Sequence, residues 1–302
     1  MDAVFLIRNF ADKHNLILGI CSAERLSWAE ERIRNKWAPF VSVGIEERIN
    51  PRKTMPSANS IIVIGKSYFY SLPELPLDSR PRGQISAGAI GLDYHMVLSS
   101  LLKELAEALP GQSQVYVDTG PLWERGFAQQ AGLGFMGRNG HIISAKLGSF
   151  FHIGYIMTGL SFPTYQAQTL PDQCGTCNLC ITHCPGNSAT HCVAYLTQKK
   201  GSLEECEKRI MGNWLYGCDI CQRVCPFNKD LKGPVQPELA RPLLSDVLEM
   251  SNAYFNKYYK PTAAGWRGKK NLQRNALIAL QNIQRGVNNG GMEYPGPTRL
   301  NI

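Results

Sequence analysis

The sequence lacks any long apolar run. Even its longest apolar stretches are short, and Ile61–Gly65 is an example. A helix that spans a bilayer needs about 20 consecutive apolar residues. The sequence therefore predicts no membrane-spanning segment.

The sequence also predicts no secretory signal peptide. The first residues, Met1–Arg8, reach an arginine and then Asp12 too soon for the apolar core of a signal peptide. We therefore expect a cytoplasmic, reducing location, where disulfides rarely persist. Eight of the ten cysteines lie between Cys174 and Cys225, and in such a compartment this crowding favours metal ligation.

Charged residues are fewer than usual, at 19% of the chain, whereas 44% of the residues are hydrophobic. This balance argues against a largely disordered chain. A length of 302 residues suffices for one large domain and a smaller one. The formal net charge of +8 is consistent with a polyanionic partner such as nucleic acid, but it is also common in proteins that bind none.

No internal repeat or low-complexity tract interrupts the first half, which alternates between two kinds of signal. Strand-like and helix-like segments that follow one another favour an α/β layer architecture. The predicted strands are 61–64, 114–117, 141–144 and 153–156, and the predicted helices are 93–109, capped by Asp93, and 122–131.

A boundary is expected near 163–171, where this alternation gives way to cysteine spacing. A further helix is predicted over 270–285, followed by an irregular tail rich in glycine and proline. The expected domains are 1–165, 166–232 and 233–302.

The cysteines form two runs that each end in Cys-x3-Cys-Pro. The first is Cys174, Cys177, Cys180 and Cys184, and the second is Cys192, Cys218, Cys221 and Cys225. In ferredoxins with two clusters the fourth cysteine of such a run ligates the other cluster. We therefore assign one [4Fe–4S] cluster to Cys174, Cys177, Cys180 and Cys225, and the second to Cys192, Cys218, Cys221 and Cys184.

Structural zinc is the alternative interpretation, because Cys-x2-Cys pairs also bind zinc as tetrathiolates. The two Cys-x3-Cys-Pro endings favour the clusters. Cys21 and Cys206 are left over and receive no role, since a lone cysteine is most often a small buried hydrophobe.

Two other patterns were weighed against plainer interpretations. Gly132-x-Gly134-x-x-Gly137 matches a dinucleotide fingerprint, but it follows a helix and precedes a strand, the reverse of the required order. These glycines would let the backbone approach a large flat ligand, or they form an ordinary tight loop. His95 is expected to be a helix residue rather than a metal ligand, because no second histidine stands at ligand spacing.

The clusters need an electron acceptor, which the preceding 160 residues must house, and these residues resemble a known family. The chain is similar to epoxyqueuosine reductases over most of 45–230, and more weakly at Leu272–Ala276. The segments that carry the resemblance are Asn50–Ile64, Asp93–His95, Val117–Pro121, Glu124–Arg125, Ala131–Asn139, Gly148–Phe151, Tyr195–Thr197, Tyr216–Gln222 and Val224–Pro226.

The resemblance implies an α/β cobalamin-binding domain, like that of reductive dehalogenases, followed by an α+β ferredoxin-like domain with two clusters. It implies an oxidoreductase that reduces epoxyqueuosine to queuosine at the wobble position of tRNA. The implied partners are the tRNA anticodon stem-loop and a low-potential electron donor such as flavodoxin or ferredoxin, and we expect a monomer.

By resemblance, Asp118 is the proton donor. It follows a predicted strand, the usual edge for ligands in open α/β sheets. Shielding beneath the corrin would raise the pKa of its carboxyl, which suits a general acid, whereas an Asp after a strand is otherwise a turn or cap residue. Other family positions near the cobalamin match Arg48, Gly137, Arg138, Ile142, Cys218 and Asp219. Arg48 and Arg138 are alternatively solvated arginines.

The chain departs from the family pattern in several places. Ser86–Ala89 replaces a segment that usually contains tyrosine, Arg138 is more often lysine, and the Cys184–Cys192 linker is short. The sequence corresponds to a short form without the C-terminal helical repeats of longer members. Lys269, Lys270, Arg274 and nearby Arg267 would form a basic face for tRNA phosphates, or only a solvated helix end.

Two rival functions follow from the same residues. One is a related cobalamin reductase that acts on a small organic molecule, as dehalogenases do. The other is a non-catalytic iron–sulfur electron carrier whose first domain only docks.

Overall fold

The computed structural model describes residues 2–34, 40–71, 80–162, 170–235 and 237–287. The chain divides into two compact units. Unit 1 comprises 1–68 and 94–177, and unit 2 comprises 69–93 and 178–302. Among the described helices, none has the length and apolar character that crossing a membrane requires.

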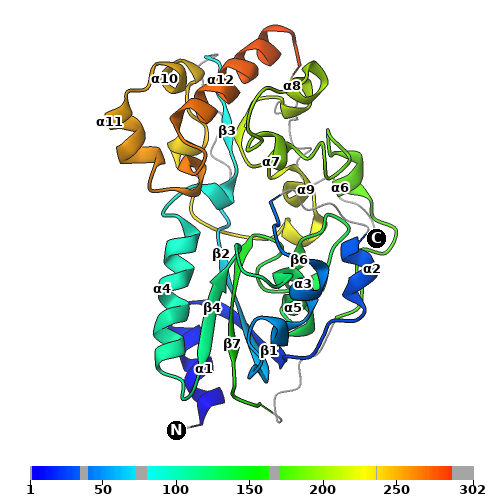
Figure 1. Ribbon diagram of the computed structural model, residues 1–302. Coiled ribbons are helices and arrows are strands. Elements are labelled where there is room, and N and C mark those ends of the chain that lie inside the picture. The colour runs from blue at the N-terminus through cyan, green and yellow to red at the C-terminus, as the bar shows by residue number, and fades with distance from the viewer. Residues whose placement is uncertain (1, 35–39, 72–79, 163–169, 236, 288–302) are drawn as a thin grey trace. The chain divides into compact units, whose positions relative to one another are not determined.

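Unit 1 is built on a four-stranded sheet (Figure 1). Its strand order is β1 (Leu16–Ser22), β2 (Ser60–Ser67), β7 (Phe151–Thr158) and β4 (Ser113–Val117). All three pairings are antiparallel. The run Ile61–Ile64 forms the centre of β2 and is fully buried, because both faces of the sheet are covered.

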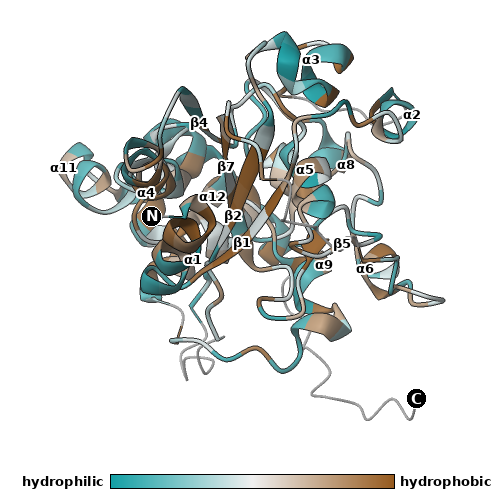
Figure 2. Ribbon diagram, turned by 90° about the horizontal axis from the view of Figure 1, so that it is seen from below, coloured by the Kyte–Doolittle hydropathy of each residue, from teal (hydrophilic) through white to brown (hydrophobic). Residues whose placement is uncertain are grey.

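One face of the sheet is covered by α1 (Ala3–Lys13) and α4 (Tyr94–Glu107). The α4 side chains at a spacing of three and four residues, Leu98, Leu102 and Leu105, are buried against the sheet. Figure 2 shows α1 and α4 on one side of the apolar strands and α3 and α5 on the other.

The other face carries α2 (Ala29–Arg34), α3 (Ile45–Ile49), η1 (Pro51–Lys53) and α5 (Glu124–Gln130), with a small hairpin of β5 (Phe135–Met136) and β6 (Ile142–Ile143). Phe127 of α5 is fully buried beside Ile61 and Val63 of β2. A side chain at Gly19 of β1 would collide with the carbonyl oxygen of Ala131, so glycine is required for this close packing.

The predicted α/β layering is confirmed, but the antiparallel pairing changes where a site can form. The carboxyl ends of β2 and β4 and the amino end of β7 lie at one edge, since Ser67 pairs with Phe151 and Val117 with Gly154. Asp118, which follows β4, lies at this edge. The first helix and strand, α1 and β1, were not predicted.

Unit 2 combines a short parallel pair, β3 (Gln84–Ile85) and β8 (Trp214–Tyr216), with many short helices. They are η2 (Ala87–Ala89), α6 (Leu179–Thr182), α7 (Val193–Leu196), α8 (Glu205–Met211), α9 (Ile220–Arg223), η3 (Pro226–Asn228), η4 (Glu238–Ala240), α10 (Leu244–Glu249), α11 (Asn252–Tyr254), the π-helical turn η5 (Phe255–Tyr259) and η6 (Ala263–Gly265).

The longest helix of unit 2, α12 (Lys269–Gln284), runs through its interior. Asn275 is fully buried, and its amide donates to the carbonyl oxygens of Thr197 and Leu215, each at 2.8 Å. Asn282 donates in the same way to Lys208 and Gly212, at 2.7 and 2.8 Å. The predicted helix over 270–285 is therefore a core element of unit 2.

The two units differ from the three contiguous domains expected from the sequence. Residues 69–93 belong to unit 2 because β3 pairs with β8 and the Asp219 carboxylate accepts from Ser86 Oγ at 2.6 Å. Residues 233–287 also belong there, through α10 and α12. Of the predicted boundary near 163–171, residues 163–169 lie outside the described part of the chain, as does the predicted tail from 288 onwards.

Candidate active site

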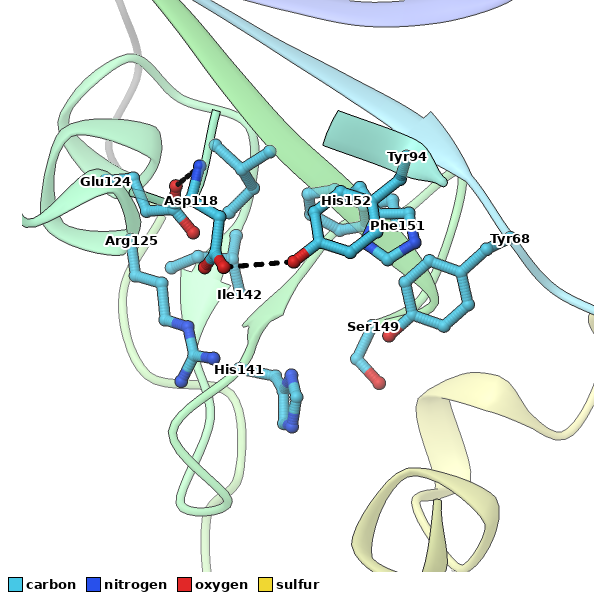
Figure 3. A pocket seen from close by; sticks show the side chains of 11 residues that line it. Tyr68, Tyr94, Asp118, Glu124, Arg125, His141, Ile142, Ser149, Phe151 and His152 are labelled. Atoms are coloured by element: carbon cyan, nitrogen blue, oxygen red, sulfur yellow. Dashed lines mark hydrogen bonds between the residues drawn. The ribbon is translucent and has the colours of Figure 1, made fainter. Parts of the chain in front are cut away.

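A polar hollow with a volume of about 130 Å³, open to solvent, lies at the edge of the unit 1 sheet where β2 and β4 end (Figure 3). Its walls come from the ends of β2, β4 and β7, the first turns of α4 and α5, and the β5–β6 hairpin. The lining residues are Tyr68, Tyr94, Asp118, Glu124, Arg125, His141, Ile142, Ser149, Phe151, His152 and Ile153.

Asp118 stands at the centre of the polar contacts in this hollow. It is one of three non-glycine residues with positive φ in the described chain, at +56°. This left-handed conformation costs an ordinary residue roughly 1–2 kcal/mol, and Asp tolerates it better than most. The conformation turns the chain sharply after β4, and the carboxylate remains 52% exposed.

Two side chains from the start of α4 meet the Asp118 carboxylate. Tyr94 Oη donates to Oδ2 at 3.0 Å, and His95 Nε2 lies 3.3 Å from the same oxygen. Neighbouring residues reach one atom because the first turn of α4 faces the end of β4. Tyr94 and His95 therefore fix the direction of the carboxylate.

A row of aromatic rings continues from this contact. The ring of Tyr94 stacks on His152 with centroids 3.8 Å apart and on His95 at 4.0 Å. The ring of Tyr68 extends the row at its His152 end, with its centroid 4.3 Å from that of His152. The row gives one wall of the hollow a set of polarisable rings with hydrogen-bonding edges.

Glu124, the first residue of α5, contacts Asp118 from the other side. Its Oε2 accepts the backbone N–H of Asp118 at 3.2 Å (Figure 3). Burial and then the negative charge of Asp118 raise the pKa of Glu124 to about 8. Glu124 therefore carries a proton at neutral pH.

The pKa of Asp118 moves in the opposite direction. Partial burial raises it, but the hydrogen bonds from His95 and Tyr94 and the nearby positive charge of Arg125 lower it below its ordinary value. Among the protein's own residues, three stabilising partners outweigh desolvation, and the raised pKa expected for Asp118 beneath a corrin stays a prediction. The opposite shifts of the two pKa values favour a proton on Glu124 over one on Asp118.

Arg125 and His141 complete the floor of the hollow. Arg125 Nη1 donates to the carbonyl oxygen of Gly140 at 2.9 Å. Burial and the charge of Arg125 lower the pKa of His141 to about 3, so its imidazole is neutral. One fixed cation therefore stands beside the carboxyl pair.

Besides Asp118, four of the residues predicted near cobalamin lie in unit 1. Ile142 lines the hollow and is 2% exposed. Arg48 lies in the last turn of α3, and burial lowers the pKa of its guanidinium, so it is not a freely solvated arginine. Arg138 is exposed, and its Nη2 donates to Gly175 at 2.6 Å. Gly137 lies in the β5–β6 hairpin.

The hairpin glycines have an explanation within the hairpin itself. A side chain at Gly134 would collide with the backbone of Ile143, and one at Gly137 with the Ile143 side chain. The glycine spacing therefore reflects close packing of β5 on β6, which corresponds to the tight-loop alternative.

The other two residues predicted near cobalamin, Cys218 and Asp219, lie in unit 2. The Asp219 carboxylate is buried and accepts from Ser86 Oγ at 2.6 Å and from the Ala87 N–H at 2.8 Å. Within unit 2 this side chain anchors the segment before η2. Its role toward cobalamin remains a prediction.

All ten cysteines are among the described residues, and none forms a disulfide. Burial raises the pKa of Cys221, and the neighbouring thiols Cys192 and Cys184 raise it further. Cys218 is raised by burial and, among other groups, by Cys221 and Cys192. Cys180, assigned to the first cluster, also raises the pKa of Cys221, so the division of the cysteines between two clusters stays a prediction. Within the described residues, no three His, Cys, Asp or Glu side chains converge on a single-ion site.

The predicted basic face on the last helix is altered by packing. Arg274 is half-buried, and its Nη1 donates to the carbonyl oxygens of Lys199 at 2.7 Å and Gly201 at 2.9 Å. Burial lowers the pKa of its guanidinium. Arg274 therefore supports the α7–α8 connection instead of facing a phosphate. Lys270 is exposed, which is compatible with the predicted basic face.

The two remaining cysteines differ from each other. Cys21 is 7% exposed in the unit 1 core, where burial raises the pKa of its thiol to about 12, so it is an inert small hydrophobe. Cys206 is exposed on α8.

Sequence reasoning missed part of the site. Tyr94 and His95 were quoted as a motif but not assigned to Asp118, and Glu124 received no role. Glu124 is the first residue of α5 and stands six residues after Asp118. This spacing indicates their contact only once the turn after β4 is known. His152 lies in β7, and nothing in the sequence around it indicates that its ring stacks on Tyr94.

Unit 1 has an α/β fold with a polar hollow, and comparison with known proteins identifies the class as an iron–sulfur oxidoreductase. A family model described as "4Fe-4S double cluster binding domain" matches residues 173–228, and one described as "Epoxyqueuosine reductase QueG, DUF1730" matches residues 48–119. An epoxyqueuosine reductase of Bacillus cereus is 37% identical over 88% of this chain and 77% of its own length. That of Staphylococcus aureus is 35% identical over 87% of this chain and 75% of its own length.

Solved structures agree with these relatives. The epoxyqueuosine reductase of Streptococcus thermophilus has a TM-score of 0.86 at 34% identity, covering 94% of this chain and 82% of that one. An epoxyqueuosine reductase bound to an epoxyqueuosine-modified tRNA-Tyr stem-loop has a TM-score of 0.84 at 30% identity, covering 92% and 82%. The chain belongs to the epoxyqueuosine reductase family.

Proposed function

We propose that this chain reduces epoxyqueuosine in tRNA to queuosine, with Asp118 as the proton donor to the substrate. The observation that carries the proposal is the convergence of Tyr94, His95 and Glu124 on Asp118 in the unit 1 hollow. Family membership and the relative solved with a modified tRNA stem-loop support the substrate.

We propose that residues of the hollow contribute to holding a cobalamin. A corrin ring is broad, largely apolar and fringed with amides, and the hollow offers Ile142 and Phe151 beside the hydrogen-bonding groups of Tyr68 and Ser149. When bound there, cobalamin would supply low-potential electrons, received from the two [4Fe–4S] clusters, to the epoxide. A low-potential donor such as flavodoxin or ferredoxin would recharge the clusters.

The protein's own residues must handle protons. Reduction of an epoxide to an alkene consumes two electrons and two protons and releases the oxygen as water. Asp118 is held by Tyr94 and His95, so a proton that it delivers leaves a carboxylate already stabilised by hydrogen bonds. Glu124 is the adjacent group that carries a proton at neutral pH and can restore the pair.

Binding of RNA distinguishes the proposed function from a dehalogenase-like reductase, which would act on a small organic molecule.

We also propose a reducing compartment such as the cytoplasm, where ten cysteines without a disulfide would remain as thiols or cluster ligands.

The test begins with anaerobic reconstitution with iron, sulfide and cobalamin. We expect about eight irons and one cobalamin per chain, and conversion of an epoxyqueuosine-containing stem-loop to the queuosine form by mass spectrometry. Eight irons without cobalamin, or bound cobalamin without conversion, would overturn the proposal.

Asp118→Asn tests the proton donor. The amide keeps the size and can still accept from Tyr94, but it supplies no acidic proton, so turnover should fall at least ~100-fold. Cofactor content and stem-loop affinity should stay as in the wild type. Turnover within about threefold of wild type would remove Asp118 from the reaction.

A further inference from the structure

The segment between α10 and α12 exposes large aromatic rings where a soluble surface usually has polar side chains. Tyr254 is 43% exposed, Tyr258 41% and Trp266 58%. We name the surface formed by Tyr254, Lys257, Tyr258, Lys260, Trp266 and Arg267 the aromatic–basic surface. It lies entirely in unit 2 and plays no part in the hollow of unit 1.

The backbone beneath these side chains is well anchored. Tyr259 is buried, and its carbonyl oxygen accepts from Thr262 Oγ1 at 2.8 Å. The turn η5 is π-helical, closed by the Lys260 N–H on the Phe255 carbonyl at 2.9 Å, and such turns recur at functional sites. Gly265 packs so closely on the end of η5 that a side chain there would collide with it.

Cations lie directly on the exposed rings. The Arg267 guanidinium carbon is 3.7 Å from the centroid of the Trp266 ring, and Lys257 Nζ is 5.0 Å from that of Tyr258. Tyr254 and Tyr258 have centroids 4.6 Å apart. The arrangement pairs flat stacking faces with positive charge.

The surrounding sequence has an unusual charge balance. There is no Asp or Glu between Glu249 and Glu293, a stretch that holds seven basic residues: Lys257, Lys260, Arg267, Lys269, Lys270, Arg274 and Arg285. Asp246 of α10 acts electrostatically on the buried Tyr259. Asp93 also lies against this segment, because its backbone N–H donates to the carbonyl oxygen of Pro261 at 2.9 Å. With three cations and no acid among its own residues, the surface complements a polyanion that also presents flat groups.

We infer that the aromatic–basic surface binds the single-stranded loop of an RNA, its rings stacking on unpaired bases and its Lys and Arg side chains contacting phosphates. Paired RNA hides its base faces, whereas loop bases can be splayed onto aromatic side chains. A protein partner would explain the rings but would not require the absence of acids. The inference rests on the proposed function and assigns residues to its RNA substrate.

The surface shares Arg267 with the basic face expected at α12 but differs from it in the other residues. Arg274 of that face has its guanidinium committed to backbone carbonyls. Lys269 Nζ likewise lies 3.4 Å from the carbonyl oxygen of Met250. The contacts with RNA therefore shift from the helix to the turns that precede it.

Trp266→Ala and Tyr258→Ala, alone and combined, test the stacking in the full-length reconstituted protein. The probe is an unmodified RNA anticodon stem-loop, compared with a fully paired duplex of equal length by fluorescence anisotropy. Each variant should weaken hairpin binding about tenfold and duplex binding much less. Leu277→Ala, which removes an apolar side chain 49% exposed on α12, is the matched control and should leave both unchanged.

Lys257→Glu tests the electrostatic part. It should reduce the slope of log affinity against log salt by about one or more, whereas Lys103→Glu on α4 should not. Unchanged hairpin affinity in the double aromatic variant, or an equal loss for hairpin and duplex, would overturn the inference. A change in oligomeric state by light scattering, without a change in RNA affinity, would assign the surface to a protein contact instead.

These readouts are independent of turnover. If the wild type binds the hairpin through this surface but converts no epoxyqueuosine, the proposed function fails and the surface stands. If it converts epoxyqueuosine and the aromatic variants bind RNA as the wild type does, only the surface assignment fails.

Discussion

Asp118 and Glu124 show how two neighbouring carboxyls acquire opposite properties. Asp118 receives hydrogen bonds from Tyr94 and His95 and keeps a lowered pKa. Glu124 is shielded from water and faces the Asp118 charge, so its pKa rises. Pairs whose environments push their pKa values apart are typical of acid–base sites. The pair therefore provides a proton store beside the proposed proton donor.

The proton on Glu124 gives a prediction for the pH profile. Because its pKa is about 8 in the folded protein, turnover limited by proton supply should fall as pH rises through about 8. Glu124→Gln keeps an oxygen that can accept the Asp118 N–H but holds no titratable proton. Its turnover should be about tenfold lower or more, without the decline near pH 8.

The contradicting outcome for Glu124 is specific. If Glu124→Gln lowers turnover but keeps the same decline near pH 8, another group supplies the proton and Glu124 only positions the backbone of Asp118. Gln129→Glu is unsuitable as a control because it adds a charge, whereas Gln130→Ala on the same helix leaves the pair untouched.

Among the elements, α12 is the one whose role differs most from its sequence pattern. The pattern indicated a terminal helix, but the structure uses two buried asparagines to hold the loops of unit 2. Asn275 satisfies the carbonyl oxygens of Thr197 and Leu215, and Leu215 lies in β8, just before Cys218. A buried carbonyl left without a donor costs about 1–3 kcal/mol.

Asn275→Ala should therefore lower the free energy of unfolding by about 2 kcal/mol or more and reduce iron retention. Denaturant unfolding followed by circular dichroism measures the first effect, and iron analysis after gel filtration measures the second. Leu277→Ala, on the exposed side of the same helix, should change stability by about 0.5 kcal/mol or less. Equal effects of the two substitutions would contradict the bracing role.

For the whole molecule, the assignment of cysteines to clusters predicts how iron is lost. Cys184→Ser and Cys218→Ser are assigned to the same cluster, so the double variant should keep about four irons. If instead each cluster used one contiguous run, the double variant would lose both. Cys206→Ser, at an exposed position outside the runs, should keep about eight. Iron counting and electron paramagnetic resonance distinguish these results.

The sequence by itself determined the features that depend on local order and chemical type. Cysteine spacing predicted the double-cluster domain, because most ligands of each cluster recur two residues apart and each run ends in Cys-x3-Cys-Pro. The apolar run of β2 and the leucine spacing of α4 determined those elements, since burial periodicity is a local property. Motifs in the right order identified the family and pointed to Asp118.

Only the tertiary structure decided the properties that depend on distant neighbours. The Asp118 pKa is lowered because α4 brings Tyr94 and His95 to the end of β4, and no spacing in the sequence contains that approach. The inclusion of 69–93 in unit 2, and the commitment of Arg274 to carbonyls, likewise depend on which surfaces become buried. Electrostatics and burial are sums over neighbours in space, so they follow the fold.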